Sequence, residues 1–213
     1  MTSMDVWHAE KLGSAAVEAL RHNGFDAHYC TTRSEALKLL LPWLTAGATV
    51  GLGGSMTLNE LDLRQLARDA GCELLDHSDP MLDAAAKRQI LRRQLTSDVF
   101  ISSSNAITLD GQLVNIDGNG NRVAALSFGP AKTIVVAGVN KIVADVDEAF
   151  ARLELRAAPM NNHRLDRPNP CVKTGRCMDC DGDSRICRIY HVLRKRPSAS
   201  DFSVFIIGET LGF

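Results

Sequence analysis

The residues best suited to chemistry in this sequence are four cysteines that lie close together near its end. They occupy seventeen residues with the spacing C-x5-C-x2-C-x6-C, and they are Cys171, Cys177, Cys180 and Cys187. A C-x2-C pair supplies two thiolates from one tight turn, and four thiolates suit either zinc or an iron–sulfur cluster. The spacing matches neither the bacterial nor the plant-type ferredoxin pattern. We predict a metal or cluster here; the alternative is a set of reduced cysteines on a flap.

A second concentration of polar residues is the segment "NIDGNGNR" at 115–122. Its two glycines and its asparagines can adopt positive φ, so the chain can double back twice. Its arginine can clamp an anion through two N–H groups. The candidate ligand-binding residues are Asp117, Gly118, Asn119, Gly120, Asn121 and Arg122. The alternative is a tight turn whose polar side chains bond their own backbone.

A third candidate is the glycine-rich loop "GLGGSMT" at 51–57. Its glycines allow the backbone to approach a ligand, and its hydroxyls and the N–H groups of a following helix can hold a phosphate or carboxylate. The residues proposed to bind are Gly53, Gly54, Ser55 and Thr57. The loop is neither a Walker loop nor the spaced dinucleotide fingerprint, and the alternative is an ordinary strand-to-helix turn.

Alternating strand and helix patterns place these segments. Apolar runs predict strands at 48–54, 72–76, 98–104, 131–138 and 202–208, and a hairpin joins 106–109 to 112–116 through the turn Asp110-Gly111. Helices are expected at 5–22, 57–70, 79–95 and 145–157, and another begins at Thr32 and kinks or ends at Pro42. This alternation predicts an α/β sandwich around a largely parallel sheet.

Parallel sheets bind ligands at the carboxyl ends of their strands, so we expect three loops to meet there. The loops are 51–57, 102–105 with the loop after residue 116, and 138–141. Asn105 and Asn140 add polar side chains, and Lys141 adds a cation; for the last pair the alternative is a capped helix start with a solvated lysine. We therefore predict one pocket that prefers an anion.

Composition bounds the class of protein. The chain has 213 residues, 45% of them hydrophobic, with a formal net charge of -1. These values suit a folded protein with a substantial core and give no general attraction to nucleic acid or anionic lipid. The sequence shows no signal-peptide pattern at its start and no apolar run long enough to span a bilayer. We expect a cytoplasmic protein in which the isolated Cys30 and Cys72 are reduced core residues.

Charge is unevenly distributed along the chain. Residues 163–196 contain nine Lys or Arg and four Asp, a net +5, whereas the rest carries 15 basic and 21 acidic residues. We interpret 1–213 as a single domain and 163–196 as a Cys-rich basic flap within it. The flap would face an acidic partner, an anionic ligand or a neighbouring subunit in a homo-oligomer; the alternative is a solvated surface.

Several motifs together resemble those of one known family. "GLGGSMTL", "SSSNAITLDGQLVNIDGNGNRVAALSFGP", "VAGVNKIV", "PCVKTGRCMDCDGDSRIC" and "IIGETLGF" span nearly the whole chain. They are similar to the LUD-domain (lactate utilization) proteins, and most of all to a cysteine-containing branch. The resemblance implies the Rossmann-like NagB/RpiA/CoA-transferase-like fold. It also implies a role beside iron–sulfur redox subunits in oxidising L-lactate to pyruvate, or in another hydroxy-acid oxidation.

The same resemblance suggests an alternative function. Enzymes of that superfamily act on sugar phosphates or CoA and bind them at the position that the 51–57 loop matches. The hairpin also resembles an isomerase motif whose aspartate is replaced here by Asn105, and asparagine cannot act as a general acid or base. Asp117 and Glu209 are the remaining acid–base candidates. The ligand would be an organic acid, a sugar phosphate or a CoA-like molecule.

Overall fold

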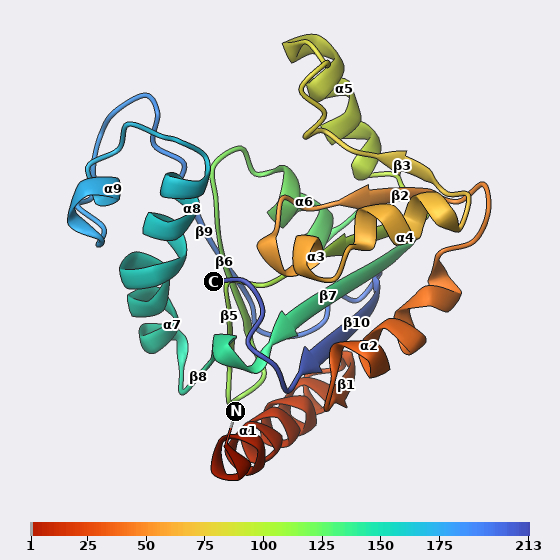
Figure 1. Ribbon diagram of the computed structural model, residues 1–213, viewed down its shortest axis with the longest axis vertical. Coiled ribbons are helices and arrows are strands. Elements are labelled where there is room, and N and C mark those ends of the chain that lie inside the picture. The colour runs from red at the N-terminus through yellow and green to blue at the C-terminus, as the bar shows by residue number, and fades with distance from the viewer. Residues whose placement is uncertain (1) are drawn as a thin grey trace.

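The computed structural model describes residues 2–213, and within them the chain folds around two β-sheets (Figure 1). The larger sheet has six parallel strands in the order β1-β10-β7-β4-β2-β3, and the smaller has the order β8-β5-β6-β9. The strands are β1 (Asp26–Cys30), β2 (Thr49–Leu52), β3 (Glu73–Leu75), β4 (Val99–Ser102), β5 (Ala106–Thr108), β6 (Leu113–Asp117), β7 (Lys132–Gly138), β8 (Ile142–Val143), β9 (Ile189–Leu193) and β10 (Asp201–Ile207). This confirms the predicted Rossmann-like α/β class with a largely parallel sheet.

Helices cover both faces of the larger sheet. The α-helices are α1 (Ser3–His22), α2 (Arg33–Leu40), α3 (Met56–Glu60), α4 (Leu63–Asp69), α5 (Ala84–Gln94), α6 (Asn121–Ser127), α7 (Val146–Arg152), α8 (Ala158–Arg164) and α9 (Cys171–Thr174). Short 3-10 turns occur at η1 (Leu41–Trp43) and η2 (Val139–Lys141). Figure 1 shows α7, α8 and α9 on the side of the smaller sheet, and α5 extending away beside β3.

The core divides into layers because β7 and β10 are apolar on both faces. Val136 and Ile207 face α2, α3 and α4, whereas Val135 and Ile206 face α1, α6 and the inner side of the smaller sheet. The outer side of the smaller sheet is covered by α7 and the residue that follows it, through Ala149 and Leu153. Both faces of the parallel sheet are therefore buried, as such sheets require.

The smaller sheet joins distant parts of the chain. β5 and β6 form the expected antiparallel hairpin, β8 pairs with β5 in parallel, and β9 pairs with β6 antiparallel. β9 lies inside the 163–196 segment, so the last part of that segment is a strand of the sheet. Neither β9 nor β1 was predicted from the sequence.

Two helix predictions need correction. The single helix expected at 57–70 is broken into α3 and α4, because Asp62 adopts a left-handed conformation with φ of 51°. The helix expected from Asp79 begins later, at Ala84. Asp79 instead accepts a hydrogen bond from the Met81 N–H in a tight turn, and the Asp83 side chain caps the helix by accepting from the Ala86 N–H.

The helix expected at 145–157 continues to Arg164 through a π turn, η3 (Leu153–Ala157). Pro159 follows the turn and has no N–H to give to a carbonyl behind it. The Glu154 carbonyl would have been its acceptor in the π pattern. It accepts instead from the Cys177 N–H at 2.9 Å, which ties the cysteine segment to this helix.

No helix in residues 2–213 is long and apolar enough to cross a membrane.

The hairpin turn at Gly111 packs directly on the end of α1, and we predict that Gly111→Ala destabilises the protein by about 2–4 kcal/mol. Gly111 has φ of +80°, and a Cβ there would lie 2.5 Å from the Ala19 carbonyl carbon. Gly47→Ala is the matched control, since Gly47 also has φ of +80° but has nothing within 4 Å of its Cβ position. Backbone strain alone should cost the control about 1 kcal/mol. Urea denaturation measures both; equal losses would mean that the contact with α1 contributes nothing.

Candidate functional site

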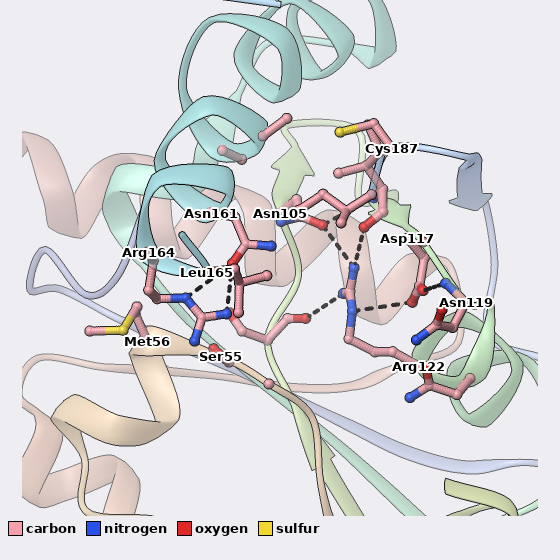
Figure 2. Close-up of a pocket in the computed structure, with 18 of the residues that line it drawn as sticks. Ser55, Met56, Asn105, Asp117, Asn119, Arg122, Asn161, Arg164, Leu165 and Cys187 are labelled. Atoms are coloured by element: carbon pink, nitrogen blue, oxygen red, sulfur yellow. Dashed lines mark hydrogen bonds and ion pairs between the residues drawn. The ribbon is translucent and has the colours of Figure 1, made fainter. Parts of the chain in front are cut away.

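A cavity of about 680 Å³ lies where the carboxyl ends of β2 and β4 meet the smaller sheet and α8 (Figure 2). Its wall combines the loops expected to meet with a part of the basic segment. The lining from these regions is 54–56, 102–105, 116–119, Asn121, Arg122, Lys141, Asn161, Arg164, Leu165, Arg167 and 183–188. The order of the strands therefore gathers segments that are far apart in the sequence.

The lining is strongly cationic. Within the described chain it contains eight Lys or Arg and two Asp. The basic residues are Arg64, Lys87, Arg122, Lys141, Arg164, Arg167, Arg185 and Arg188. Four of them belong to the 163–196 segment, whose charge thus faces this cavity. Such a surplus in a partly enclosed space attracts anions.

Arg122 is bound by the protein on every side of its guanidinium. Nη1 donates to the Ser103 carbonyl (3.1 Å) and to Asn115 Oδ1 (2.6 Å), while Nη2 donates to Asn105 Oδ1 (2.9 Å) and to the Ile116 carbonyl (2.8 Å). Nε lies 3.6 Å from Asp117 Oδ2. The N–H groups that the sequence analysis assigned to a ligand clamp are therefore used inside the protein. Arg122 contributes its charge to the cavity and positions its neighbours.

Asn105 and Asp117 are held by these same contacts. Asn105 Oδ1 accepts from Arg122 and from the Ile116 N–H, which directs its amide Nδ2 to the cavity side. Asp117 Oδ1 accepts from the N–H groups of Asn119 and Gly120, so it closes the turn before α6. An anionic ligand would thus meet the Asn105 amide as a donor, while the Asp117 carboxylate is turned toward backbone and Arg122.

Lys141 is the point at which three loops meet. Its Nζ donates to Thr57 Oγ1 and Ser103 Oγ, each at 2.9 Å, and the residue is 3% exposed. Burial, with repulsion from Arg152 and Arg122, lowers the pKa of Lys141 to about 7. The amine can therefore exchange a proton near neutral pH, unlike an ordinary lysine. Lys141 is therefore not the solvated lysine of the alternative interpretation.

His77 is a lining residue that the sequence analysis missed. It follows β3, and its Nδ1 lies 3.2 Å from Gln94 Nε2. Because an amide nitrogen cannot accept, Nδ1 is the acceptor and the ring proton sits on Nε2. Burial lowers the pKa of His77, which favours the neutral ring. Its position just beyond the carboxyl end of a strand was the sequence signal that could have found it.

Several predicted residues support the cavity without lining it. Gly53 allows β2 to approach β4, since a Cβ there would lie 2.6 Å from Ser102 Oγ. Gly120 begins α6 with φ of 84°. Asn140 holds the last residues of the chain, because its Oδ1 accepts from the Leu211 N–H and its Nδ2 donates to the Gly212 carbonyl. The Glu209 carboxylate is bound by Arg33 at 2.7 Å, away from the lining.

The four clustered cysteines line a second, small cavity beside the first. All four are free thiols; Cys171 and Cys187 are buried, and Cys177 and Cys180 are half-buried. Burial raises the pKa of Cys187 to about 11. In residues 2–213 no group of three or more His, Cys, Asp or Glu side chains is arranged to hold a metal ion as the chain stands. Cys187 lines both cavities.

Comparison with known proteins places the chain in context. A family model described as "LUD domain" matches residues 14–207. A solved structure of a DUF162 family protein from Deinococcus radiodurans is similar, with a TM-score of 0.52 and 12% identity. That match covers 93% of this chain and 98% of the other, and at this identity it shows the fold alone. No curated protein matches the chain.

The Arg122 contacts predict a large effect on stability. Arg122→Met should lower the free energy of unfolding by about 3–5 kcal/mol, because it leaves the buried Asp117 carboxylate unpaired and several acceptors without donors. Arg164→Met is the matched control, since Arg164 lines the same cavity but donates only to Asn161 Oδ1. Its loss should cost about 1 kcal/mol or less. Denaturant titration of both variants checks this, and equal stabilities would show that the Arg122 contacts contribute little.

Proposed function

Because the chain belongs to the LUD-domain family, we propose that this lactate-utilization-type protein binds an organic anion in the 680 Å³ cavity. In this proposal it takes part in the oxidation of L-lactate to pyruvate, or of another hydroxy acid to the corresponding oxo acid. Iron–sulfur subunits are its redox partners. The observation that carries the anion site is the surplus of eight cationic side chains over two carboxylates in the lining.

The contacts available to a carboxylate lie at the carboxyl ends of the strands. Asn105 offers its amide Nδ2, and Ser55 offers its hydroxyl at the start of α3. Figure 2 shows Arg164 on α8 facing the cavity across from Arg122 on α6, so the anion would lie between two positive groups. Charge-assisted hydrogen bonds of this kind are the stronger ones in proteins. The side chains thus bind and orient the acid group.

Lys141 is the candidate group for proton transfer. Its amine, with a pKa of about 7, can accept a proton from a hydroxyl or from a carbon next to a carbonyl. The neutral His77 ring can donate a hydrogen bond from Nε2–H to a ligand oxygen. Both line the cavity, and neither Asp117 nor Glu209 is free for the role. These groups support an acid–base function that the sequence alone does not identify.

A second candidate function is that of a sugar-phosphate or CoA-type enzyme. The cavity volume and the number of cations favour it, because a three-carbon acid carries one negative charge and would fill a small part of such a space. A phosphorylated ligand would use more of the arginines. Ligand charge and size therefore distinguish the two candidates.

Isothermal titration calorimetry of the full chain tests the proposal. L-Lactate, pyruvate, ribose 5-phosphate and CoA are titrated separately at fixed ionic strength. Binding of the first two, weakened in Arg164→Met, supports the hydroxy-acid function. Tighter binding of the phosphorylated compounds supports the second candidate. If none of the four binds and sulfate does not bind either, the cavity is not an anion site.

The pKa of Lys141 predicts a pH dependence of anion binding. Below about pH 7 the amine is protonated and attracts the anion; as the pH rises through about 7 it loses its charge, so affinity falls. We expect the affinity for sulfate, whose own charge is constant over this range, to fall by roughly tenfold or more, because a charged hydrogen bond contributes about 1.5–3 kcal/mol.

Lys141→Met should remove this pH dependence without unfolding the protein. Met fills the same space, and the two hydroxyls that bound the amine lie within 3.4 Å of each other, so each keeps a partner. Lys11→Met, at an exposed lysine on α1, is the control and should keep the wild-type pH profile. A pH dependence that survives in Lys141→Met would assign it to another group.

A further inference from the structure

We propose that Cys171, Cys177, Cys180 and Cys187 bind a thiophilic metal centre, either zinc or an iron–sulfur cluster. The bound centre fixes residues 183–188, which form the wall between the small cavity and the anion cavity. The proposal concerns a second site and does not depend on which anion the first one takes. It rests on the four thiols facing one space and on the contacts that hold their backbone.

The fold brings the thiols together from three parts of the chain. Cys171 begins α9, Cys177 and Cys180 lie in the following turn, and Cys187 precedes β9. All four line the same small cavity. Among the described residues that line it none is Asp, Glu or His, so its ligands are soft sulfur donors. Such a set suits zinc or an iron–sulfur cluster rather than a hard cation.

The backbone between Cys177 and Cys180 forms a tight turn, as in C-x2-C pairs that bind metals. Asp179 has a positive φ of 44°, which bends the chain between Cys177 and Cys180. The Asp179 N–H donates to Cys177 Sγ at 3.4 Å. Hydrogen bonds from N–H groups to sulfur are among the features that tune cysteine-bound clusters. The turn thus presents one sulfur as an acceptor before any metal is bound.

Arg185 braces the other side of the cavity. Its Nη1 donates to the Cys180 carbonyl at 2.7 Å, and its Nε donates to the Cys187 carbonyl at 2.8 Å. The Cys177 N–H is held by the Glu154 carbonyl of the π turn. Three of the four cysteines are therefore positioned through their backbone, which leaves their thiols free for a ligand.

Binding requires the thiols to move closer together, because no three of them are arranged around a metal as the described chain stands. The Cys177–Cys180 turn is able to supply it. It is half-buried, and Gly175, which precedes it, has φ of 72° and open space around it. Metal sites commonly draw a segment into place in this way, since binding and ordering share one free energy.

Closure would affect the anion cavity next to it. Cys187 lines both cavities, as do Arg185 and Ile186, and the anion cavity is bounded on this side by 183–188. A metal centre bound to Cys180 and Cys187 would fix that wall, including the cationic Arg185 and Arg188. The metal would then stabilise the fold of the Cys-rich segment, which has few apolar side chains to do so by burial.

Metal binding to the full chain under anaerobic conditions tests the proposal. One sample receives zinc in the presence of a competing chelator, and another receives iron and sulfide. We expect about one zinc per chain, or about four iron atoms per chain with visible absorption of a cluster. Cys177→Ser and Cys180→Ser should lose it. Cys72→Ser is the matched control, since Cys72 is a half-buried free thiol elsewhere, and it should bind as the wild type does.

Two outcomes would overturn the metal site: binding of neither metal by the wild type, or equal binding by Cys72→Ser and the two turn variants. Limited trypsin digestion tests the fixing of the wall separately, because Arg188 belongs to the wall and is exposed. Bound metal should slow cleavage after Arg188 in the wild type and leave it unchanged in Cys180→Ser. Unchanged cleavage of the metal-loaded wild type would overturn the ordering of the segment.

Discussion

The cavity depends on one largely buried guanidinium. Arg122 links the end of β4, the hairpin strand β6 and the start of α6 by donating to four acceptors in these segments. Asp117, at 3.6 Å, is the one carboxylate paired with this cation in residues 2–213, and the cation is stable because its remaining donors are fully matched. The arrangement also leaves net positive charge at the cavity wall. Arg122 thus joins the folding of the hairpin to the electrostatics of the site.

The neutral composition of the whole chain hides this local charge. The formal net charge is -1, yet the cavity gathers eight basic residues with two acidic ones. The order of the strands brings these residues together. β2, β4 and β7 end at the same edge of the larger sheet, and pairing of β9 with β6 holds the basic segment beside that edge. Lys141 lies in this environment, where burial first and then repulsion from Arg152 and Arg122 lower its pKa.

Sequence patterns predicted the strands that are buried along their whole length. They failed for elements that exist only through strand pairing or that end at an unusual backbone conformation. The apolar runs of β7 and β10 were sufficient to identify them. β9 was missed because "IYHVL" lies among basic residues and becomes a strand only by pairing with β6. The break at Asp62 depends on a positive φ that no apolar periodicity reports. The loops of the site followed from the rule on strand ends. The partners of Arg122 did not, because they depend on the register between the end of β4 and β6.

The π turn before Pro159 sets the direction of everything after it in that helix. A π turn holds one residue more than an α-helical turn, and each residue of an α-helix rotates by roughly 100° about the axis. The side chains of α8 are therefore rotated by about that angle from where an unbroken helix would carry them. Because of this single extra residue, the cavity is faced by Asn161, Arg164 and Leu165, as Figure 2 shows. The direction of the cavity wall is thus set by a backbone irregularity that lies seven to eleven residues before Arg164. A chain that lacked one residue at 153–157 would carry the same side chains to a different face.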